Sequence, residues 1–309
     1  MKNLEHTLLI GANGFFGTNI QEYLTSRNIT FYQINGKNHL DIEVEGKLNN
    51  FLKKNKKIKS IINCSAFVGG VSYGYSYQAN LLTKNSKMAM NIYEAALENN
   101  IKNIINPISN CIYPSSVETY KEEDMFGGNP HESVYFYAQS KRYTIYLAES
   151  YFQQYGLNSN NVILSNMYGP HDHFEEKRSH AVGAIVRKVL DAKLNGIDMV
   201  EIWGSGKQER EWLYVEDGVK AITKSFELAS GCNTFNIGTN KTVSIKELAE
   251  LIKIKSNWEG LFDYNTTKPE GVLKKSVDGN YGNNLISWSP KVNIEMGIEK
   301  TISWYLENL

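Results

Sequence analysis

Short apolar runs alternate, in the first half of the chain, with longer segments of helical periodicity. The runs are continuous rather than alternating, which is typical of strands buried on both faces of a parallel sheet. The predicted strands are residues 6–12, 29–35, 59–66, 102–109 and 161–166, and the predicted helices between them are residues 16–27, 78–99 and 137–155. This alternation predicts an α/β fold, a Rossmann-like doubly wound parallel sheet with right-handed crossovers.

The pattern changes near residue 167, where a polar, proline-interrupted loop begins. We expect residues 1–166 to form the Rossmann domain, residues 167–309 to form mainly a smaller α/β substrate domain, and a segment of about 213–240 to return to the main sheet. Two strands, MVEIW and EWLYV, are expected to pair around a Gly-Ser-Gly turn, and FNIG to form a further strand. The remaining predicted helices lie near 181–193, 216–229, 244–254 and 294–308.

Composition and charge exclude several classes of protein. Lys+Arg and Asp+Glu are both 33 in 309 residues, so the net charge is zero and nothing suggests binding along a nucleic-acid backbone. Three scattered cysteines predict neither a disulfide framework nor a zinc ribbon. We find no apolar segment of the roughly 20 residues that cross a bilayer and no secretory signal, and we expect a cytoplasmic protein without a membrane partner. The lysine run at 53–57 is interpreted as a solvated helix end.

A glycine loop follows the first predicted strand and opens the first predicted helix. Gly11, Gly14 and Gly17 allow a tight turn, close approach of a pyrophosphate and close helix–strand packing. The pyrophosphate of a dinucleotide would then lie at the helix N-terminus. The second strand ends without a carboxylate and is followed by Lys37, which favours the 2′-phosphate of NADP(H) over the 2′-hydroxyl of NAD.

A second group of candidate residues lies at the end of the fourth predicted strand and on the following helix. Tyr137 and Lys141 are four residues apart, so they share one face of a helix. We expect the lysine cation to lower the pKa of the phenol and make it a proton donor and acceptor near neutrality. Ser109 ends the strand, where ligands of open α/β sheets bind, and could hydrogen-bond the same substrate oxygen.

At this point the chain resembles the extended short-chain dehydrogenase/reductase superfamily, and within it the GDP-L-fucose synthase family. The resemblance runs from end to end of the chain. Its motifs are GANGFFG, SAFVGGV, SNCIYP, YAQSK, NMYGPHDHF, SHAVGAIVRK, VEIWGSGKQEREWLYVED, FNIGTN and KPEGVLKKSVD. It implies reduction by NADPH of the C4 ketone of a GDP-4-keto-6-deoxy sugar, with prior epimerisation at C3 and C5.

The resemblance also implies roles for single residues. Cys111 matches the epimerisation base of the family, and His180 matches its partner acid. Tyr137 would protonate the alkoxide formed at C4, Ser109 would orient it, and Lys141 would hold the nicotinamide ribose. A thiol can serve as the base if a nearby cation lowers its pKa.

Binding residues follow from the same motifs. The cofactor site would comprise Gly11, Asn13, Gly14, Phe15, Phe16, Gly17, Lys37, Ala66, Val68, Ile108, Tyr137, Lys141, Asn166, Met167 and His180, with Gly69 and Gly70 beside Val68. The GDP-sugar site would comprise Asn166, Arg187, Trp203, Arg210 and Lys268. Arginine suits a diphosphate because its fork makes paired hydrogen bonds. We expect no metal, although His171-Asp172-His173 carries ligand-type residues.

Three departures from the family pattern make the substrate less certain than the reaction. Asn110 stands where the family has a second serine, Phe67 where it has a lysine, and Asn13 where it often has a basic residue. The alternatives are a GDP-4-keto-6-deoxy-heptose C4-reductase with little epimerase activity, a 4,6-dehydratase, a C4-epimerase and a non-catalytic dinucleotide-binding protein. The resemblance further implies a homodimer joined by a four-helix bundle.

Overall fold

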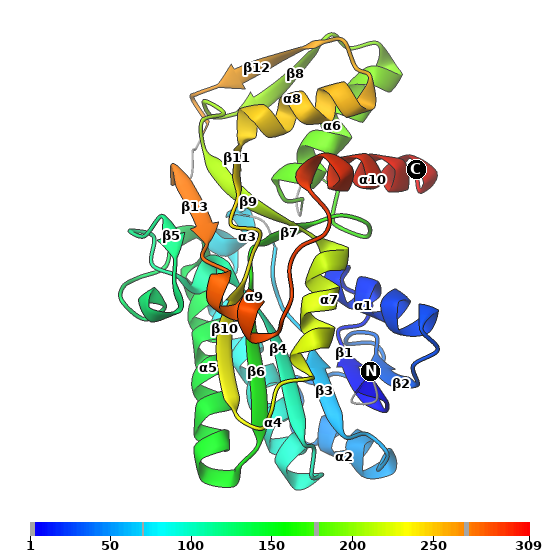
Figure 1. The fold of residues 1–309 in the computed structure, drawn as a ribbon, viewed down its shortest axis with the longest axis vertical. Helices are drawn as coiled ribbons and strands as arrows, with labels where there is room; N and C mark the ends of the chain where they lie inside the picture. Colours follow the sequence, from blue (N-terminus) through cyan, green and yellow to red (C-terminus); the bar gives the residue numbers. More distant parts are fainter. Residues whose placement is uncertain (1–3, 70, 176–178, 269–271) are drawn as a thin grey trace.

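A parallel sheet lies at the centre of the larger part of this computed structural model, which describes residues 4–69, 71–175, 179–268 and 272–309. Among these residues the sheet has six strands in the order β10-β6-β4-β3-β1-β2, and every neighbouring pair is parallel. The strands are β1 (Thr7–Ile10), β2 (Phe31–Ile34), β3 (Ser60–Asn63), β4 (Asn103–Ser109), β6 (Asn158–Leu164) and β10 (Cys232–Ile237). The predicted Rossmann-like sheet is therefore confirmed (Figure 1).

Helices cover both faces of the sheet, so each strand is buried on two sides. One face packs against α1 (Phe15–Ser26) and α7 (Val215–Ser225) through core residues such as Ile105. The other face packs, through residues such as Ile104, against α2 (Lys47–Lys54), α4 (Gln78–Glu98) and α5 (Tyr135–Tyr155). Burial of each such side chain stabilises the fold by about 1.5–3 kcal/mol, which explains the continuous apolar runs.

The rest of the chain builds a second core above the carboxyl ends of the strands (Figure 1). Its helices are α6 (Ala181–Asn195), α8 (Ile245–Ser256) and α10 (Ile294–Glu307). Its strands are β7 (Asn166–Tyr168), β8 (Met199–Trp203), β9 (Glu209–Tyr214), β11 (Thr242–Ser244), β12 (Leu261–Asn265) and β13 (Lys274–Val277). The short elements α3 (Val71–Ser76), β5 (Thr119–Tyr120) and α9 (Asn280–Leu285) complete the order.

The predicted pairing of MVEIW with EWLYV is wrong. The first of these segments is β8, which pairs with β12 in a parallel ladder. The second lies in β9, which pairs with β7, β11 and β13. Gly204 and Gly206, in the turn between them, both have positive φ and direct β9 toward the main sheet rather than back along β8.

Two buried carboxylates hold the second core to the main sheet. Asp217, in the first turn of α7, accepts hydrogen bonds from the backbone N–H groups of Lys291 and Val292 at 2.7 and 2.8 Å. Glu211 of β9 accepts from the backbone N–H of Val277 at 2.6 Å and from that of Asn240 at 3.2 Å.

β10 follows α7 and lies in the main sheet, at the place expected for the returning segment. The exact domain division at residue 166 stays a prediction.

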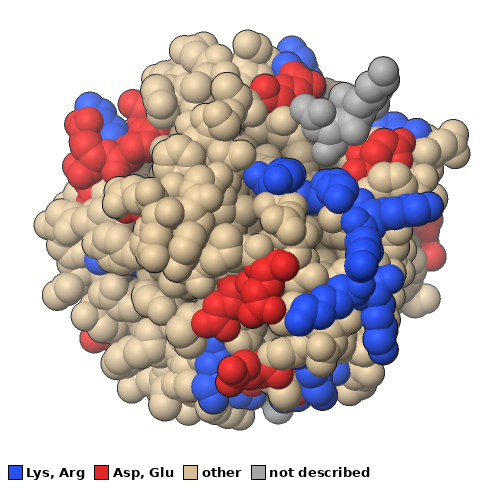
Figure 2. Space-filling model, turned by 90° about the horizontal axis from the view of Figure 1, so that it is seen from below, with Lys and Arg blue, Asp and Glu red and all other residues tan. Residues whose placement is uncertain are grey.

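Lysine side chains gather on the end of the molecule opposite the second core, as Figure 2 shows. Lys53 and Lys54 form the last turn of α2, and Lys56, Lys57 and Lys59 follow it, all exposed. The lysine run is therefore a solvated helix end, as predicted. Within the described part of the chain, no helix has the length and apolar content needed to span a membrane.

Candidate active site

The glycine loop joins β1 to α1 as the sequence predicts. Gly11 has a φ of +77°, and a Cβ there would lie 2.7 Å from the carbonyl oxygen of Cys64. At Gly17 a Cβ would lie 2.1 Å from the carbonyl oxygen of Gly11, so only glycine allows the helix to start so close to the strand. Gly14 caps α1, no side chain caps the helix end, and its first turn holds no acidic residue. The first-turn N–H groups thus remain available to a pyrophosphate.

Two aromatic residues of this loop face the protein core. Phe16 exposes 8% of its surface and packs with the hydrophobic cluster of α1 and α7, and Phe15 packs against the same cluster. Ile108, near the end of β4, is 2% exposed. For Phe16 and Ile108 the buried side chains leave mainly backbone atoms available to a cofactor, whereas the Phe15 side chain is only partly buried.

The end of β2 lies beside the glycine loop. A Cβ on Gly36 would lie 3.3 Å from the side-chain amide of Asn13, so the two loops are in contact. Lys37 follows, and its ammonium lies 3.2 Å from Asp41 and 3.8 Å from Glu43. Its side chain is 63% exposed, so it remains free to turn toward a 2′-phosphate, although two carboxylates already compete for its charge.

Four of the predicted catalytic side chains come together where β4 meets α5. Ser109 ends β4, and its Oγ accepts a hydrogen bond from the backbone N–H of Cys111 at 3.3 Å. Lys141 lies one turn after Tyr137 on α5, with its ammonium 5.6 Å from the centre of the tyrosine ring. The thiol of Cys111 interacts electrostatically with both Tyr137 and Lys141. The two segments therefore form one site.

The expected lowering of the pKa of Tyr137 is wrong. Burial raises the pKa of this phenol, and the nearby Cys111 thiol adds to the effect. Burial also lowers the pKa of Lys141 to about 8, against the opposing influence of Cys111 and Cys64. Desolvation thus dominates at both groups, because each charged form loses its hydration. A phenol that keeps its proton is suited to donating it.

Burial and nearby polar groups also have opposing effects on the pKa of the Cys111 thiol. Burial raises the pKa of its thiol, whereas the hydrogen bond with Ser109 and the cations Lys275, Lys141 and Arg142 lower it. The expected cations are present, but burial outweighs them, so the expectation of a depressed thiol pKa is wrong. Two of these cations were not singled out from the sequence. Arg142 lies one residue after Lys141, and Lys275 belongs to the KPEGVLKKSVD motif.

Arg142 also fixes the geometry of this site. Its Nε donates to the carbonyl oxygen of Ile112 at 2.9 Å, and its terminal nitrogen donates to that of Gly128 at 2.9 Å. Ile112 directly follows Cys111, so α5 holds the short helical turn (Asn110–Ile112) that carries the thiol. A buried arginine that pairs with carbonyl oxygens rather than carboxylates positions the loop without neutralising its own charge.

The remaining predicted cofactor residues follow β3 and β6. Ala66 and Val68 are exposed in the segment after β3, and Gly70 lies outside the described residues. Asn166 donates its side-chain amide to the carbonyl oxygen of Glu211 at 2.9 Å, which ties β7 to β9. Met167 packs near α7, where a Cβ on Gly218 would lie 3.0 Å from its sulfur.

His180 begins α6 and faces a buried carboxylate. Its Nδ1 lies 3.5 Å from Oδ1 of Asp172, and the imidazole is 56% exposed while the carboxylate is 2% exposed. The hydrogen bond with Asp172 raises the pKa of His180 above its ordinary value, against burial. Asp172 therefore favours the imidazolium, the form that can donate a proton. The pairing of His180 with Cys111 stays a prediction, and residues 176–178 before it lie outside the described residues.

Trp203 provides an exposed aromatic face on the second core. It is 56% exposed at the end of β8, and its indole N–H donates to Oε1 of Glu201 at 2.8 Å. The ammonium groups of Lys188 and Lys268 lie 5.9 and 5.4 Å from its ring centre. An open ring flanked by two cations suits a nucleotide base next to its phosphates. Residues 269–271 of the K-P-E-G motif lie outside the described residues.

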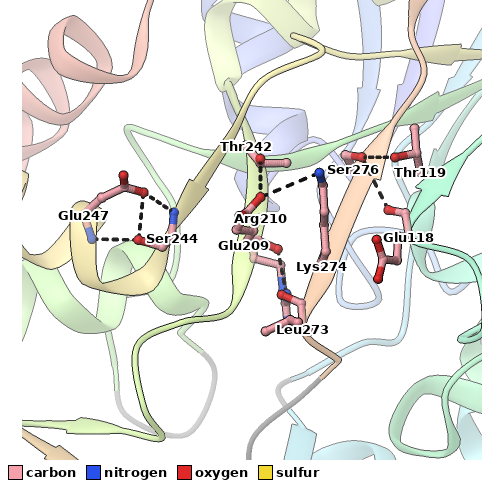
Figure 3. A network of polar contacts seen from close by, with 10 residues as sticks. All are labelled: Glu118, Thr119, Glu209, Arg210, Thr242, Ser244, Glu247, Leu273, Lys274 and Ser276. Carbon is pink, nitrogen blue, oxygen red and sulfur yellow. Dashed lines mark hydrogen bonds and ion pairs between the residues drawn. The ribbon is translucent and has the colours of Figure 1, made fainter.

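Two further cations, Arg210 of β9 and Lys275 of β13, are paired in register across neighbouring strands. Arg210 of β9 donates to the carbonyl oxygens of Glu209 at 2.7 Å and Leu273 at 3.5 Å, while Glu209 itself accepts from Thr242 at 2.7 Å (Figure 3). Burial lowers the pKa of Arg210, and burial together with Arg210 lowers the pKa of Lys275. Two adjacent half-buried cations attract an anion strongly.

Arg187 of α6 is the remaining predicted substrate residue. Its Nε is buried and has no hydrogen-bond partner among the described residues. A buried donor without a partner costs free energy, and a phosphate oxygen would satisfy it. By contrast, the described residues include no group of three or more His, Cys, Asp or Glu placed to hold a metal ion.

Comparison with known proteins gives the family. Residues 7–238 match the NAD dependent epimerase/dehydratase family, which is three quarters of the chain. The chain belongs to this family. GDP-L-fucose synthase 1 of Arabidopsis thaliana is 30% identical over 300 residues, covering 97% of this chain and 92% of the plant protein. GDP-L-colitose synthase of Yersinia pseudotuberculosis is 32% identical and covers 97% of both chains.

Solved structures of the family share the whole fold. A GDP-L-fucose synthetase of Naegleria fowleri bound to NADP superimposes with a TM-score of 0.90 at 25% identity, covering 100% of this chain and 94% of that one. A GDP-6-OMe-4-keto-L-xylo-heptose reductase from C. jejuni superimposes with a TM-score of 0.89 at 23% identity, covering 100% and 99%. At that identity the second likeness supports the fold alone.

Proposed function

We propose that this chain is an NADP-dependent oxidoreductase that reduces the C4 ketone of a GDP-4-keto-6-deoxy sugar, after epimerising it at C3 and C5. The observation that carries the proposal is the single site formed by Ser109, Cys111, Tyr137 and Lys141. It holds the groups that reduction needs and, beside them, a thiol that reduction does not need. The similarity to GDP-L-fucose synthases over nearly the full chain supports the same reaction.

NADPH is the proposed hydride source. The residues fit such a group, because the glycine loop leaves the first-turn N–H groups of α1 uncapped and without acidic neighbours. Lys37 and the Asn13 amide, at the adjoining ends of the two loops, are the groups proposed to bind the extra 2′-phosphate. When bound, NADPH supplies a hydride to the carbonyl carbon at C4. The NADP-bound structure of a related protein supports this choice.

Tyr137 and Ser109 handle the oxygen at C4 in the reductive step. As the carbonyl carbon accepts hydride, its oxygen becomes an alkoxide and takes the proton of the Tyr137 phenol. Burial keeps that phenol protonated, and the hydroxyl of Ser109 donates a hydrogen bond that orients the oxygen. Lys141, as a cation, stabilises the phenolate that remains and binds the nicotinamide ribose.

Cys111 and His180 act in the preceding epimerisation. Protons at C3 and C5 lie α to the C4 ketone, so a base can remove them to give an enolate. The Cys111 thiolate, stabilised by Lys275 and Arg142, removes the proton. His180, whose protonation Asp172 favours, returns a proton to the opposite face. Because burial raises the pKa of the thiol, the thiolate in this scheme depends on these cations and on the hydrogen bond with Ser109.

The second core binds the GDP portion. Arg187, Arg210 and Lys275 are the cations proposed for the diphosphate, and Trp203 is proposed to stack on the guanine. The identity of the sugar is the least constrained part. A relative named GDP-L-colitose synthase matches at 32% identity, so another GDP-keto sugar, including a heptose, is the second candidate substrate.

Oligomeric state and location complete the proposal. We propose a cytoplasmic homodimer in which α4 and α5 of two copies form a four-helix bundle, since these helices lie side by side and expose Leu82, Tyr146 and Tyr155. Sedimentation equilibrium tests this proposal: a dimer is expected, and a monomer at micromolar concentration would contradict it.

An NADPH-oxidation assay tests the proposed activity. With GDP-4-keto-6-deoxy-mannose as substrate, the absorbance of NADPH at its long-wavelength band should fall and a GDP-deoxyhexose should form. The same assay with NADH serves as the cofactor control, and the same assay with a GDP-4-keto-6-deoxy-heptose tests the second candidate. NADPH binding without turnover of any GDP-keto sugar would contradict the proposal and favour a binding protein.

A further inference from the structure

Four polar side chains form one row across the main sheet. They are Asn63 of β3, Asn106 of β4, Asn161 of β6 and Thr234 of β10. The strand register places Asn161 opposite both Asn106 and Thr234, and Asn63 and Asn106 directly follow the paired residues Ile62 and Ile105. The three asparagines expose only 5%, 1% and 0% of their surface. We refer to these four residues as the amide ladder. Buried amides on adjacent central strands cost free energy unless every group is paired.

Hydrogen bonds run through the amide ladder in one direction. Nδ2 of Asn63 donates to Oδ1 of Asn106 at 3.2 Å, and Nδ2 of Asn106 donates to Oδ1 of Asn161 at 2.9 Å. Nδ2 of Asn161 then donates to Oγ1 of Thr234 at 3.0 Å. The other hydrogen of the Asn106 amide goes to the hydroxyl of Tyr93 on α4, at 2.8 Å. The ladder therefore lies on the face that α4 and α5 cover.

A backbone donor fixes this direction. The N–H of Ser65 donates to Oδ1 of Asn63 at 3.2 Å, and the Ser65 hydroxyl donates to the same oxygen at 2.5 Å. Since a backbone N–H can only donate, the amide oxygen of Asn63 must face Ser65, and its nitrogen must face Asn106. Because the Asn63 nitrogen donates to Asn106, the amide oxygen of Asn106 must face Asn63. By the same argument, the amide oxygen of Asn161 must face Asn106. The three amide dipoles are thus aligned, with their oxygen ends toward Ser65.

The ladder ends at the proposed active site. The carbonyl oxygen of Ser65 accepts a hydrogen bond from the ammonium of Lys141 at 3.4 Å. The titratable groups that face Lys141 are the thiols of Cys64 and Cys111 and the phenol of Tyr137, and no carboxylate forms an ion pair with it among the described residues. Lys141 is 6% exposed. A buried ammonium without a carboxylate depends on oriented dipoles for its stabilisation.

We propose that the amide ladder is a positioning device for Lys141. It holds the Ser65 carbonyl in place and turns the negative ends of three aligned amide dipoles toward the ammonium, which keeps Lys141 charged and fixed beside Tyr137. The contact of Lys141 with a nicotinamide ribose rests on the proposed function, but the effect of the ladder on the charge of Lys141 does not. Burial lowers the pKa of Lys141 to about 8. Loss of the aligned dipoles is expected to lower it further.

The test replaces Asn106 with leucine, which has a similar shape and no polar atoms. The titration of Lys141 is followed by the ε-carbon chemical shift in protein labelled with [ε-13C]lysine, with the signal assigned from Lys141→Arg. We expect Asn106→Leu to lower the pKa of Lys141 by about half a unit or more, a roughly threefold change in the protonation equilibrium. No shift, or a shift upward, would overturn the proposal.

Asn160→Leu is the matched control. Asn160 is the neighbour of Asn161 on β6, is 3% exposed and makes two hydrogen bonds, but these go to Ser225 and Asn233 on the opposite face. The Asn160→Leu variant should lose about as much folding stability as Asn106→Leu and leave the pKa of Lys141 unchanged. An equal shift in both variants would mean that general loosening causes the effect, and would overturn the proposal.

Two further measurements keep the test decisive. If Asn106→Leu does not fold, Thr234→Val removes only the last acceptor, and it should lower the pKa of Lys141 by a smaller amount; no change there would overturn the proposal. In the reductase assay, the alkaline limb of kcat/KM should move to lower pH by the shift seen in the titration. Absence of turnover in the unmodified protein would contradict the proposed function alone, because the titration needs no substrate.

Discussion

His180 Nδ1 lies 3.5 Å from Oδ1 of Asp172, whose second oxygen is buried without a hydrogen-bond partner among the described residues. The carboxylate is also oriented by the backbone N–H of His173, which donates to Oδ1 at 2.8 Å. The negative charge of Asp172 is therefore available to stabilise the imidazolium of His180 at the start of α6. The pair places a proton donor next to the loop that precedes α6.

Asp172→Asn should lower the pKa of His180 toward 6.5, the ordinary histidine value, because the amide carries no charge. NMR titration of the imidazole, assigned with His180→Gln, measures this change. A pKa raised by folding stabilises the folded state fully below the unfolded value and loses that contribution as the pH rises through the folded value. The stability difference between Asp172→Asn and the unmodified protein should therefore shrink above neutral pH. An unchanged His180 pKa would refute the pairing.

Tyr137→Phe should reduce NADPH-dependent turnover by a factor of about 10² to 10⁴, since it removes the proposed proton donor and little volume. NADPH affinity, measured by fluorescence titration, should stay within about twofold of the unmodified value. Tyr135→Phe, two residues earlier at the start of α5, is the matched control and should retain activity. Turnover at the normal rate in Tyr137→Phe would remove this residue from the mechanism.

Cys111→Ser should abolish exchange of the C3 and C5 protons and spare reduction of a substrate that is already epimerised. The hydroxyl is a far weaker acid than the thiol, while the backbone hydrogen bond from residue 111 to Ser109 is kept. Proton exchange in D2O, followed by NMR, measures the first effect. Cys64→Ser, beside the glycine loop, is the control. Exchange that persists in Cys111→Ser would assign the base elsewhere.

Lys37→Ala should raise the KM for NADPH about tenfold and leave the KM for NADH unchanged, because only NADPH carries the 2′-phosphate. Asp41→Asn should act in the opposite direction, since it releases the ammonium from its 3.2 Å ion pair. Lys53→Ala removes another exposed lysine and serves as the control. Equal effects of Lys37→Ala on both cofactors would contradict a role in phosphate recognition.

Glu211→Gln should destabilise the fold by about 2–4 kcal/mol, because the buried carboxylate accepts hydrogen bonds from three backbone N–H groups. An amide turns an N–H donor toward one of them and leaves it unpaired. Urea unfolding measures the change, with Glu259→Gln at an exposed position as the control. A loss of less than about 0.5 kcal/mol would mean that Glu211 does not hold β9 to β13 and to the loop after β10.

Much of the fold could be predicted because it depends on local patterns. Continuous apolar runs placed five of the six strands of the main sheet, and the expected return of a segment of about 213–240 placed the sixth, β10. The strand partners of β8 and β9 could not be predicted, since they include β12 and β13, which lie about 60 residues further along the chain. A short turn suggests a hairpin, and only the tertiary structure excludes it.

The candidate site divides in the same way. The motif spacing placed Ser109, Cys111, Tyr137 and Lys141 together, because the end of β4 and the start of α5 adjoin in this fold. The protonation of these groups could not be predicted, since it depends on burial, which raises the pKa of Tyr137 and lowers that of Lys141. Lys275 was missed because it reaches Cys111 from β13, more than 160 residues away in sequence.

The most direct test of the account is the reaction with NADPH and GDP-4-keto-6-deoxy-mannose in D2O, followed by NMR of the product. The account predicts oxidation of NADPH and a GDP-deoxyhexose that carries deuterium at C3 and C5 and a proton at C4. Reduction without deuterium at C3 or C5 would contradict the epimerase step assigned to Cys111 and His180. Failure to oxidise NADPH with this or any other GDP-4-keto sugar would contradict the central claim itself.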